Sequence, residues 1–147
     1  KIKNQLYYAF NEISIIRNTT QISDLNIYIN DQTFNLKGDG LIISSSLGST
    51  GYNYSAGGPI LPLESKEIIL TAICPYYPRN WKGVVLDCGT IIKVKINQQN
   101  KRSVNVSIDN RIDYVSDLLE IKLSNIKVNL IFNEYKKYLF DRNFKIN

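Results

Sequence analysis

The chain has 147 residues, 44% of them hydrophobic and 21% charged, a composition typical of one globular domain rather than a disordered segment. It contains no histidine, which excludes Ser-His-Asp and Cys-His triads and histidine-ligated metal sites. Lys and Arg outnumber Asp and Glu by 18 to 13, an excess too small and scattered to indicate a nucleic-acid-binding surface.

Two cysteines, Cys74 and Cys88, are too few for a four-thiolate metal site or a disulfide framework. We expect free thiols, although a single bridge between them stays open. No apolar run approaches the roughly 20 residues that a membrane-spanning helix needs, so we expect no membrane contact. The start, Lys1 to Asn4, has neither Met nor an apolar signal core. We therefore expect a fragment or processed product of a longer cytoplasmic protein, with organelle targeting left open.

Alternating apolar and polar residues predict short β-strands along most of the chain. The clearest example is 90–97, which places Ile92, Val94 and Ile96 on one face. The turn at 30–32 predicts a hairpin between two such strands. In chain order the predicted strands are 13–17, 25–29, 33–36, 41–44, 67–74, 90–97, 103–109, 119–123 and 126–130. Their number and spacing predict a mostly β domain of stacked, sandwich-like sheets.

Helix signals are scarce. Ser49 or Thr50 is suited to cap a short helix over 51–56, which Gly57-Gly58-Pro59 would end. The tail, 134–144, is predicted as a helix or an extended arm. Because no repeat or flexible linker interrupts the chain, we expect residues 1–147 to form a single domain.

Two polar positions stand out in the first half of the chain. Asn11 and Glu12 interrupt an apolar stretch, so on a strand one of them would point inward or along a sheet edge and require hydrogen bonds. The simpler interpretation is a strand end or bulge. Asp39 lies between Gly38 and Gly40, where the backbone allows close approach and a carboxylate can accept from an exocyclic amine or a ribose hydroxyl. The simpler interpretation there is a hairpin turn.

Two further segments have the composition of ligand-binding loops. Gly48-Ser49-Thr50-Gly51-Tyr52 joins a predicted strand to a predicted helix, a geometry that exposes backbone N–H groups to a phosphate or polar ligand. It matches neither the P-loop nor the dinucleotide-binding fingerprint. The loop at 74–81, rich in Pro and aromatic residues, either lines a pocket or caps the core.

In their order along the chain, these segments resemble the C-terminal domain of the NAD kinases (the ATP/polyphosphate-NAD kinase family). The resemblance covers roughly residues 6–90 and rests on five blocks, at 9–17, 38–44, 48–52, 55–60 and 70–75. It implies a stacked-sheet β domain with one short helix after the Gly-Ser-Thr turn. It also implies an enzyme that phosphorylates the adenosine ribose 2′-hydroxyl of NAD to give NADP.

The resemblance implies an NAD-binding surface but no catalytic residue in this chain. The implied NAD-binding residues are Asn11, Glu12, Asp39, Ser49, Thr50, Gly51, Tyr52 and Ser55. The family's catalytic Asp belongs to a Gly-Gly-Asp-Gly motif in an N-terminal α/β domain, and that motif is absent here, so the chain alone should be inactive. The implied partners are Mg²⁺ with ATP or polyphosphate, the protein's own N-terminal domain, and further copies in a homodimer or homotetramer.

The chain departs from the family pattern at three places. Gly51 stands where the family has Ala, Tyr76-Tyr77 replaces the His-Ser of its Cys-Pro-His-Ser motif, and Asn110 replaces the Gly of an Asp-Gly pair. Two other functions stay open: a non-catalytic NAD- or NADP-sensing module, and a related lipid or diacylglycerol kinase domain. The Gly-Ser-Thr and Ser-Ala-Gly-Gly-Pro blocks favour NAD. Donor, NADH use and inhibition by NADP are left undecided.

Overall fold

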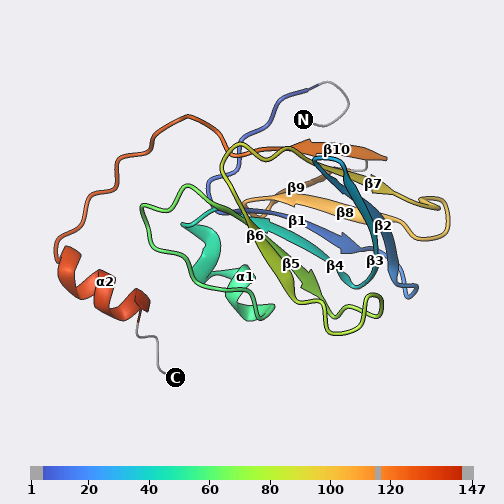
Figure 1. The fold of residues 1–147 in the computed structure, drawn as a ribbon, viewed down its shortest axis with the longest axis horizontal. Coiled ribbons are helices and arrows are strands. Elements are labelled where there is room, and N and C mark those ends of the chain that lie inside the picture. Colours follow the sequence, from blue (N-terminus) through green and yellow to red (C-terminus); the bar gives the residue numbers. More distant parts are fainter. Residues whose placement is uncertain (1–4, 115–116, 144–147) are drawn as a thin grey trace.

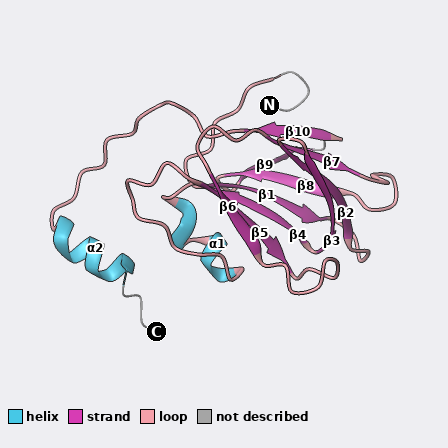
Figure 2. Ribbon diagram, in the orientation of Figure 1, coloured by secondary structure: helices cyan, strands magenta, loops and turns pink. Residues whose placement is uncertain are grey.

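The computed structural model describes residues 5–114 and 117–143, which form ten strands in two antiparallel sheets (Figures 1 and 2). The larger sheet has the order β6-β5-β4-β1-β8-β9, and the smaller has the order β10-β7-β2-β3. The strands of the larger sheet are β1 (Glu12–Arg17), β4 (Gly40–Ser44), β5 (Ile68–Ile73), β6 (Gly83–Leu86), β8 (Val104–Ile108) and β9 (Arg111–Tyr114). Those of the smaller sheet are β2 (Ser23–Ile29), β3 (Gln32–Gly38), β7 (Ile92–Ile96) and β10 (Leu118–Ile121). The predicted mostly β, stacked-sheet fold is confirmed.

One hydrophobic cluster joins the two sheets. Ile15 and Leu41 come from the larger sheet and Leu25 and Val94 from the smaller, and all four are fully buried. On β7 the apolar side chains are buried and the lysines between them are exposed, as the alternation predicts.

The central strand β4 is buried along its whole length. One face contributes to the core between the sheets, and a short helix, α1 (Tyr52–Ser55), packs near the strand beside the 3-10 turn η1 (Gly48–Thr50). The predicted single short helix is therefore present, although it is shorter than predicted.

Asp39 lies where the chain passes from one sheet to the other. β3 belongs to the smaller sheet and β4 to the larger, so the simpler prediction of a hairpin turn at this position is wrong. Next to this crossing, the backbone of Lys37 exchanges hydrogen bonds with Tyr77, which fixes the 74–81 loop beside Asp39.

Several local predictions differ from the structure. Residues 126–130 are extended but pair with no strand, and β6 and β9 were not predicted. The predicted tail helix is α2 (Tyr135–Asn143), which Figure 1 shows at the end of a long extended segment. Cys74 and Cys88 are both free. None of the described helices is long and apolar enough to cross a membrane.

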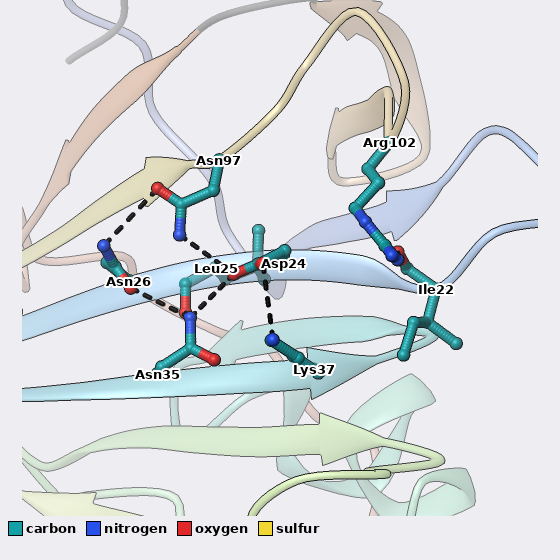
Figure 3. A network of polar contacts seen from close by, with 8 residues as sticks. All are labelled: Ile22, Asp24, Leu25, Asn26, Asn35, Lys37, Asn97 and Arg102. Atoms are coloured by element: carbon teal, nitrogen blue, oxygen red, sulfur yellow. Dashed lines mark hydrogen bonds and ion pairs between the residues drawn. The ribbon is translucent and has the colours of Figure 1, made fainter.

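A polar network ties the strands of the smaller sheet together (Figure 3). Asp24 Oδ1 accepts from Asn35 Nδ2 at 2.7 Å and from Asn97 Nδ2 at 2.9 Å, while Lys37 Nζ lies 3.7 Å from Asp24 Oδ2. Burial alone would raise the pKa of Asp24, but the two amide hydrogen bonds and the charges of Lys37 and Arg102 outweigh it and lower that pKa. Asp24 is thus held as a carboxylate that joins β2, β3 and the end of β7.

Candidate NAD-binding site

The Asn11–Glu12 pair lies at the entrance to β1, which begins at Glu12. Three successive backbone N–H groups point at one carboxylate, that of Asp109. Phe10 N–H donates to Oδ2 at 2.5 Å, and Asn11 and Glu12 N–H donate to Oδ1 at 2.7 and 3.1 Å. Asp109 in turn donates its own N–H to the Glu12 carbonyl at 3.1 Å. These bonds satisfy the backbone where the strand begins, and they fix the direction of the Asn11 and Glu12 side chains.

The two side chains of this pair face opposite sides, as predicted for neighbours on a strand. Asn11 is exposed, whereas Glu12 is buried, with 9% of its surface exposed. Burial first, and the nearby Asp109 charge second, raise the pKa of Glu12. Because burial disfavours the charged form, the Glu12 carboxylate gains from any ligand donor that compensates for burial.

The turn η1 packs directly against this pair. A Cβ atom at Gly48 would lie 2.3 Å from the Asn11 carbonyl oxygen, so only glycine fits there. A Cβ atom at Gly51 would lie 3.8 Å from Glu12 Oε2 and 3.3 Å from the Gly48 carbonyl oxygen. Glu12 therefore faces Gly51, and the missing methyl group at this departure from the family pattern leaves space beside the carboxylate.

Neither Ser49 nor Thr50 caps the helix, so that prediction is wrong. The helix begins at Tyr52, and its N-cap residue is Gly51, without a side-chain cap. The reason lies in Ser49, which is fully buried: its hydroxyl donates to the Ser46 carbonyl at 2.7 Å and accepts from Leu61 N–H at 3.1 Å. The Ser49 side chain is thus engaged inside the protein.

The remaining residues of this segment are accessible to a ligand. Thr50 is half-buried, and Gly51, Tyr52 and Ser55 are exposed. Beneath them Asn53 is fully buried, donates to the carbonyls of Ser49 and Pro59, and accepts from Thr71 Oγ1 at 2.6 Å. Asn53, with its side chain fully hydrogen-bonded, therefore supports an exposed rim formed by Thr50, Gly51, Tyr52 and Ser55.

Asp39 is held in place by Arg17. Arg17 Nε lies 2.5 Å from Asp39 Oδ1, and its Nη1 donates to the Thr19 carbonyl at 2.7 Å. The backbone is fixed as well, because Arg17 N–H donates to the Asp39 carbonyl and Asp39 N–H donates to the Ile73 carbonyl. About a third of the Asp39 side chain is exposed (33%), so the carboxylate has a fixed direction and an accessible oxygen.

Tyr52 is the first residue of α1 and is partly exposed. Burial first, then the charges of Cys74 and Asp39, raise the pKa of the Tyr52 phenol, so it stays protonated at neutral pH and can donate a hydrogen bond. Beyond Cys74, Tyr76 and Tyr77 are 61% and 55% exposed.

A cavity of about 680 Å³ lies beside the Asn11–Glu12 pair. Its wall includes Asn11, Glu12, Ser44 and Cys88, together with residues 120–125 at the end of β10 and just after it. Asp39 and residues 49–55 are not part of its lining. The predicted residues therefore do not form a single closed pocket: Asn11 and Glu12 line the cavity, and the others lie outside it.

The structure brings together most of the predicted residues. Glu12 lies beside Gly51 and the Asn11 carbonyl beside Gly48, although these residues come from segments distant in sequence. Sequence reasoning missed the support given by Asp109; its only signal was the Asp-Asn pair at a hairpin turn, where both residues have positive φ (48° and 58°). Among the described residues, no three carboxylate or thiol side chains lie close enough to hold a metal ion.

Comparison with known proteins identifies the family. The ATP-NAD kinase C-terminal domain family matches residues 10–132, which is most of the chain. The chain belongs to this family. The predicted resemblance is confirmed, and the match extends well beyond the 6–90 region on which the prediction rested.

Curated NAD kinases are similar to the chain over most of its length. The NAD kinase of Xylella fastidiosa (strain Temecula1) is 41% identical over 130 residues, which cover 85% of this chain and 49% of that protein. The NAD kinase of Rickettsia akari is 38% identical over 138 residues, covering 90% and 54%. The chain thus spans about half the length of the curated relatives it matches.

Two solved structures resemble this NAD kinase C-terminal domain. An NAD kinase from Archaeoglobus fulgidus in complex with ATP superimposes with a TM-score of 0.79 at 25% identity, covering 95% of this chain and 55% of that one. Yeast NADH kinase complexed with NADH superimposes with a TM-score of 0.69 at 27% identity, covering 82% and 37%. None of these comparisons favours a lipid kinase or a non-catalytic sensing module.

Proposed function

We propose that this chain is the NAD-binding part of an NAD kinase, which transfers a phosphoryl group to the adenosine ribose 2′-hydroxyl of NAD to give NADP. The observation that carries the proposal is a set of polar groups inside the region matched by the family: Glu12 beside Gly51 at a cavity, and the Asp39 carboxylate anchored by Arg17. A cavity together with an anchored, accessible carboxylate suits a polar ligand such as a dinucleotide.

Each of the candidate groups has a role that its chemistry suits. The Asp39 carboxylate, fixed by Arg17, accepts hydrogen bonds from an amine or hydroxyl of the adenosine. The protonated Tyr52 phenol donates to an acceptor of the same ligand. Asn11 and Glu12, at the cavity, bind ribose hydroxyls. In this proposal Thr50 and Ser55 line the rim, while Ser49 supports the segment from below.

The chain's contribution to the reaction is orientation of the acceptor. Holding a hydroxyl in line with a phosphoryl donor can supply several kcal/mol of the barrier. The catalytic Asp is proposed to belong to another part of the protein, because the sequence contains no Gly-Gly-Asp-Gly. The described residues do not fit a Mg²⁺ site, so the expected Mg²⁺, like the choice between ATP and polyphosphate, stays a prediction for the whole protein.

The proposal extends to assembly with further copies of the chain. The exposed aromatic rings of Tyr76 and Tyr77 lie beside Asp39, and exposed apolar surface next to a site is typical of an interface. A homodimer or homotetramer that covers this surface would complete the NAD site. Light scattering on the purified protein measures the mass directly, and a strictly monomeric protein would contradict this part. A cytoplasmic location also stays a prediction.

The kinase activity is tested on the full-length protein that carries this domain. NAD is supplied with ATP or polyphosphate and Mg²⁺, and NADP is measured with an NADP-specific dehydrogenase. We expect NADP formation, and an increase in KM for NAD of about tenfold in Asp39→Asn, because one charged hydrogen bond is weakened. Asp87→Asn, at an exposed position, is the matched control. NAD binding without turnover would support the sensing module, and phosphorylation of a lipid acceptor would support the lipid kinase.

A further inference from the structure

The C-terminal helix α2 is fastened to the segment beneath the candidate NAD site. At its start, Tyr135 donates its hydroxyl hydrogen to Glu64 Oε1 at 2.5 Å. Near its end, Arg142 is buried, with 3% of its surface exposed. Both residues reach the stretch that follows α1, so α2 is attached to residues 71 and 81 positions earlier in the chain.

The Arg142 guanidinium lies within a cluster of neutral acceptors. Nε and Nη2 donate to the Leu61 carbonyl at 3.3 and 3.1 Å, and Nη2 also donates to Ser49 Oγ at 3.0 Å and to the Ser46 carbonyl. Nη1 donates to the Tyr138 hydroxyl at 3.2 Å. A buried charge is costly unless its donors are paired, so this arrangement stabilises only one relative position of the helix and the segment.

These acceptors are the same groups that position η1. The Ser49 hydroxyl already bridges the Ser46 carbonyl and Leu61 N–H, and Arg142 closes the remaining side of this small network. Ser49 lies directly before Thr50 and Gly51. Loss of the guanidinium would leave the Leu61 carbonyl without its buried donors, while the Ser46 carbonyl and the Ser49 hydroxyl would keep the bond between themselves and the one from Leu61 N–H. The turn that carries the exposed rim would then be held less firmly.

We infer that Arg142 is a positioning residue for NAD, acting through Ser46, Ser49 and Leu61 on the exposed rim at 50–52. The inference rests on the proposed function for its ligand, but the anchoring itself does not. Arg142 touches no substrate in this account. Its planar fork spreads five N–H donors over separate acceptors, whereas the ammonium group of a lysine offers three donors from a single nitrogen.

The anchoring is tested first without any ligand, by amide hydrogen exchange. In Arg142→Ala we expect exchange of the amides at 48–52 to accelerate by about tenfold or more, whereas amides in the central strands β1 and β4 stay unchanged. Arg142→Lys should give an intermediate rate. Lys137→Ala, at a 72% exposed position of the same helix, is the matched control and should change neither set. Should Arg142→Ala fail to fold, Tyr138→Phe removes one of the guanidinium's partners and should give a smaller acceleration at the same amides.

The consequence for NAD is tested with the full-length enzyme. We expect Arg142→Ala to raise KM for NAD by about tenfold, with kcat changed by less than about threefold and KM for ATP unchanged. Unchanged exchange at 48–52 would overturn the anchoring, and faster exchange with an unchanged KM for NAD would overturn the link to NAD. If wild-type enzyme forms no NADP, the proposed function fails while the exchange result still decides the anchoring.

Discussion

Replacement of Asp109 by Asn tests how the start of β1 is held. Its carboxylate accepts three backbone N–H groups, two on Oδ1 and one on Oδ2. In Asp109→Asn the retained oxygen can still accept from Asn11 and Glu12, but the new NH₂ group faces the Phe10 N–H, donor against donor. Asn tolerates the positive φ of 48° at this position, so the backbone should be unaffected.

The expected cost is the loss of one charge-assisted hydrogen bond and the weakening of two others. Because Asp109 is only half-buried, we expect about 1–3 kcal/mol of lost stability. Urea unfolding followed by tryptophan fluorescence measures it, since Trp81 is the only Trp and packs against the core. Asp31→Asn, in the exposed turn between β2 and β3, is the matched control and should cost less than about 0.5 kcal/mol. Equal stability of both variants would refute the assigned role of Asp109.

Three further substitutions test separate parts of the account. Burial and Asp109 raise the pKa of Glu12, so the charged form of Glu12 destabilises the fold. Glu12→Gln should therefore raise the melting temperature at pH 7. This gain should vanish below about pH 4, where Glu12 is protonated in both the folded and the unfolded state. The pKa of Asp24 is lowered, so Asp24→Asn should cost about 1–3 kcal/mol at pH 7. This cost should begin to shrink as the pH falls below about 4 and should disappear only below the lowered pKa of Asp24 in the folded protein, where the wild-type carboxylate is itself protonated. An opposite pH trend for either variant in thermal melts would contradict these assignments. Gly48→Ala should lower stability by about 1–3 kcal/mol and weaken NAD binding, because the new Cβ atom would lie 2.3 Å from the Asn11 carbonyl oxygen. A variant as stable as the wild type in urea unfolding would refute this close packing.

Sequence patterns predicted the strands that place one face on the core. The alternation in β7 and β8 matches their burial, because the side chains of a strand point to opposite faces. The same pattern failed at 126–130, where Ile126 and Val128 are 61% and 53% exposed. Alternation describes the side chains, but a strand also needs a partner with free backbone groups, and no local pattern reveals whether one is near.

The short strand β6 shows why some elements could not be predicted. Its first residue, Gly83, has φ of +145°, and a Cβ atom there would lie 2.0 Å from the Leu70 carbonyl oxygen. The glycine is required by the neighbouring strand rather than by a turn within its own segment. A four-residue strand with this residue at its start has too little periodicity to detect.

The candidate site was predictable where polar residues interrupt apolar segments, as at Asn11, Glu12 and Asp39. Its support was not, because Asp109 lies 97 to 99 residues from the backbone groups that it binds. Ser49 shows the converse difficulty. Its place in a polar turn predicts ligand contact, yet the structure places its hydroxyl in an internal network that includes Arg142.

The central claim is that this domain binds NAD through a surface that includes Asp39. The most direct measurement is a calorimetric titration of the chain with NAD, with Asp39→Asn titrated in parallel. The account predicts saturable binding that the substitution weakens by about tenfold or more. Equal affinity of the two proteins would contradict the role of Asp39. Absence of binding by the folded chain, repeated after the rest of the protein is restored, would contradict the NAD site itself.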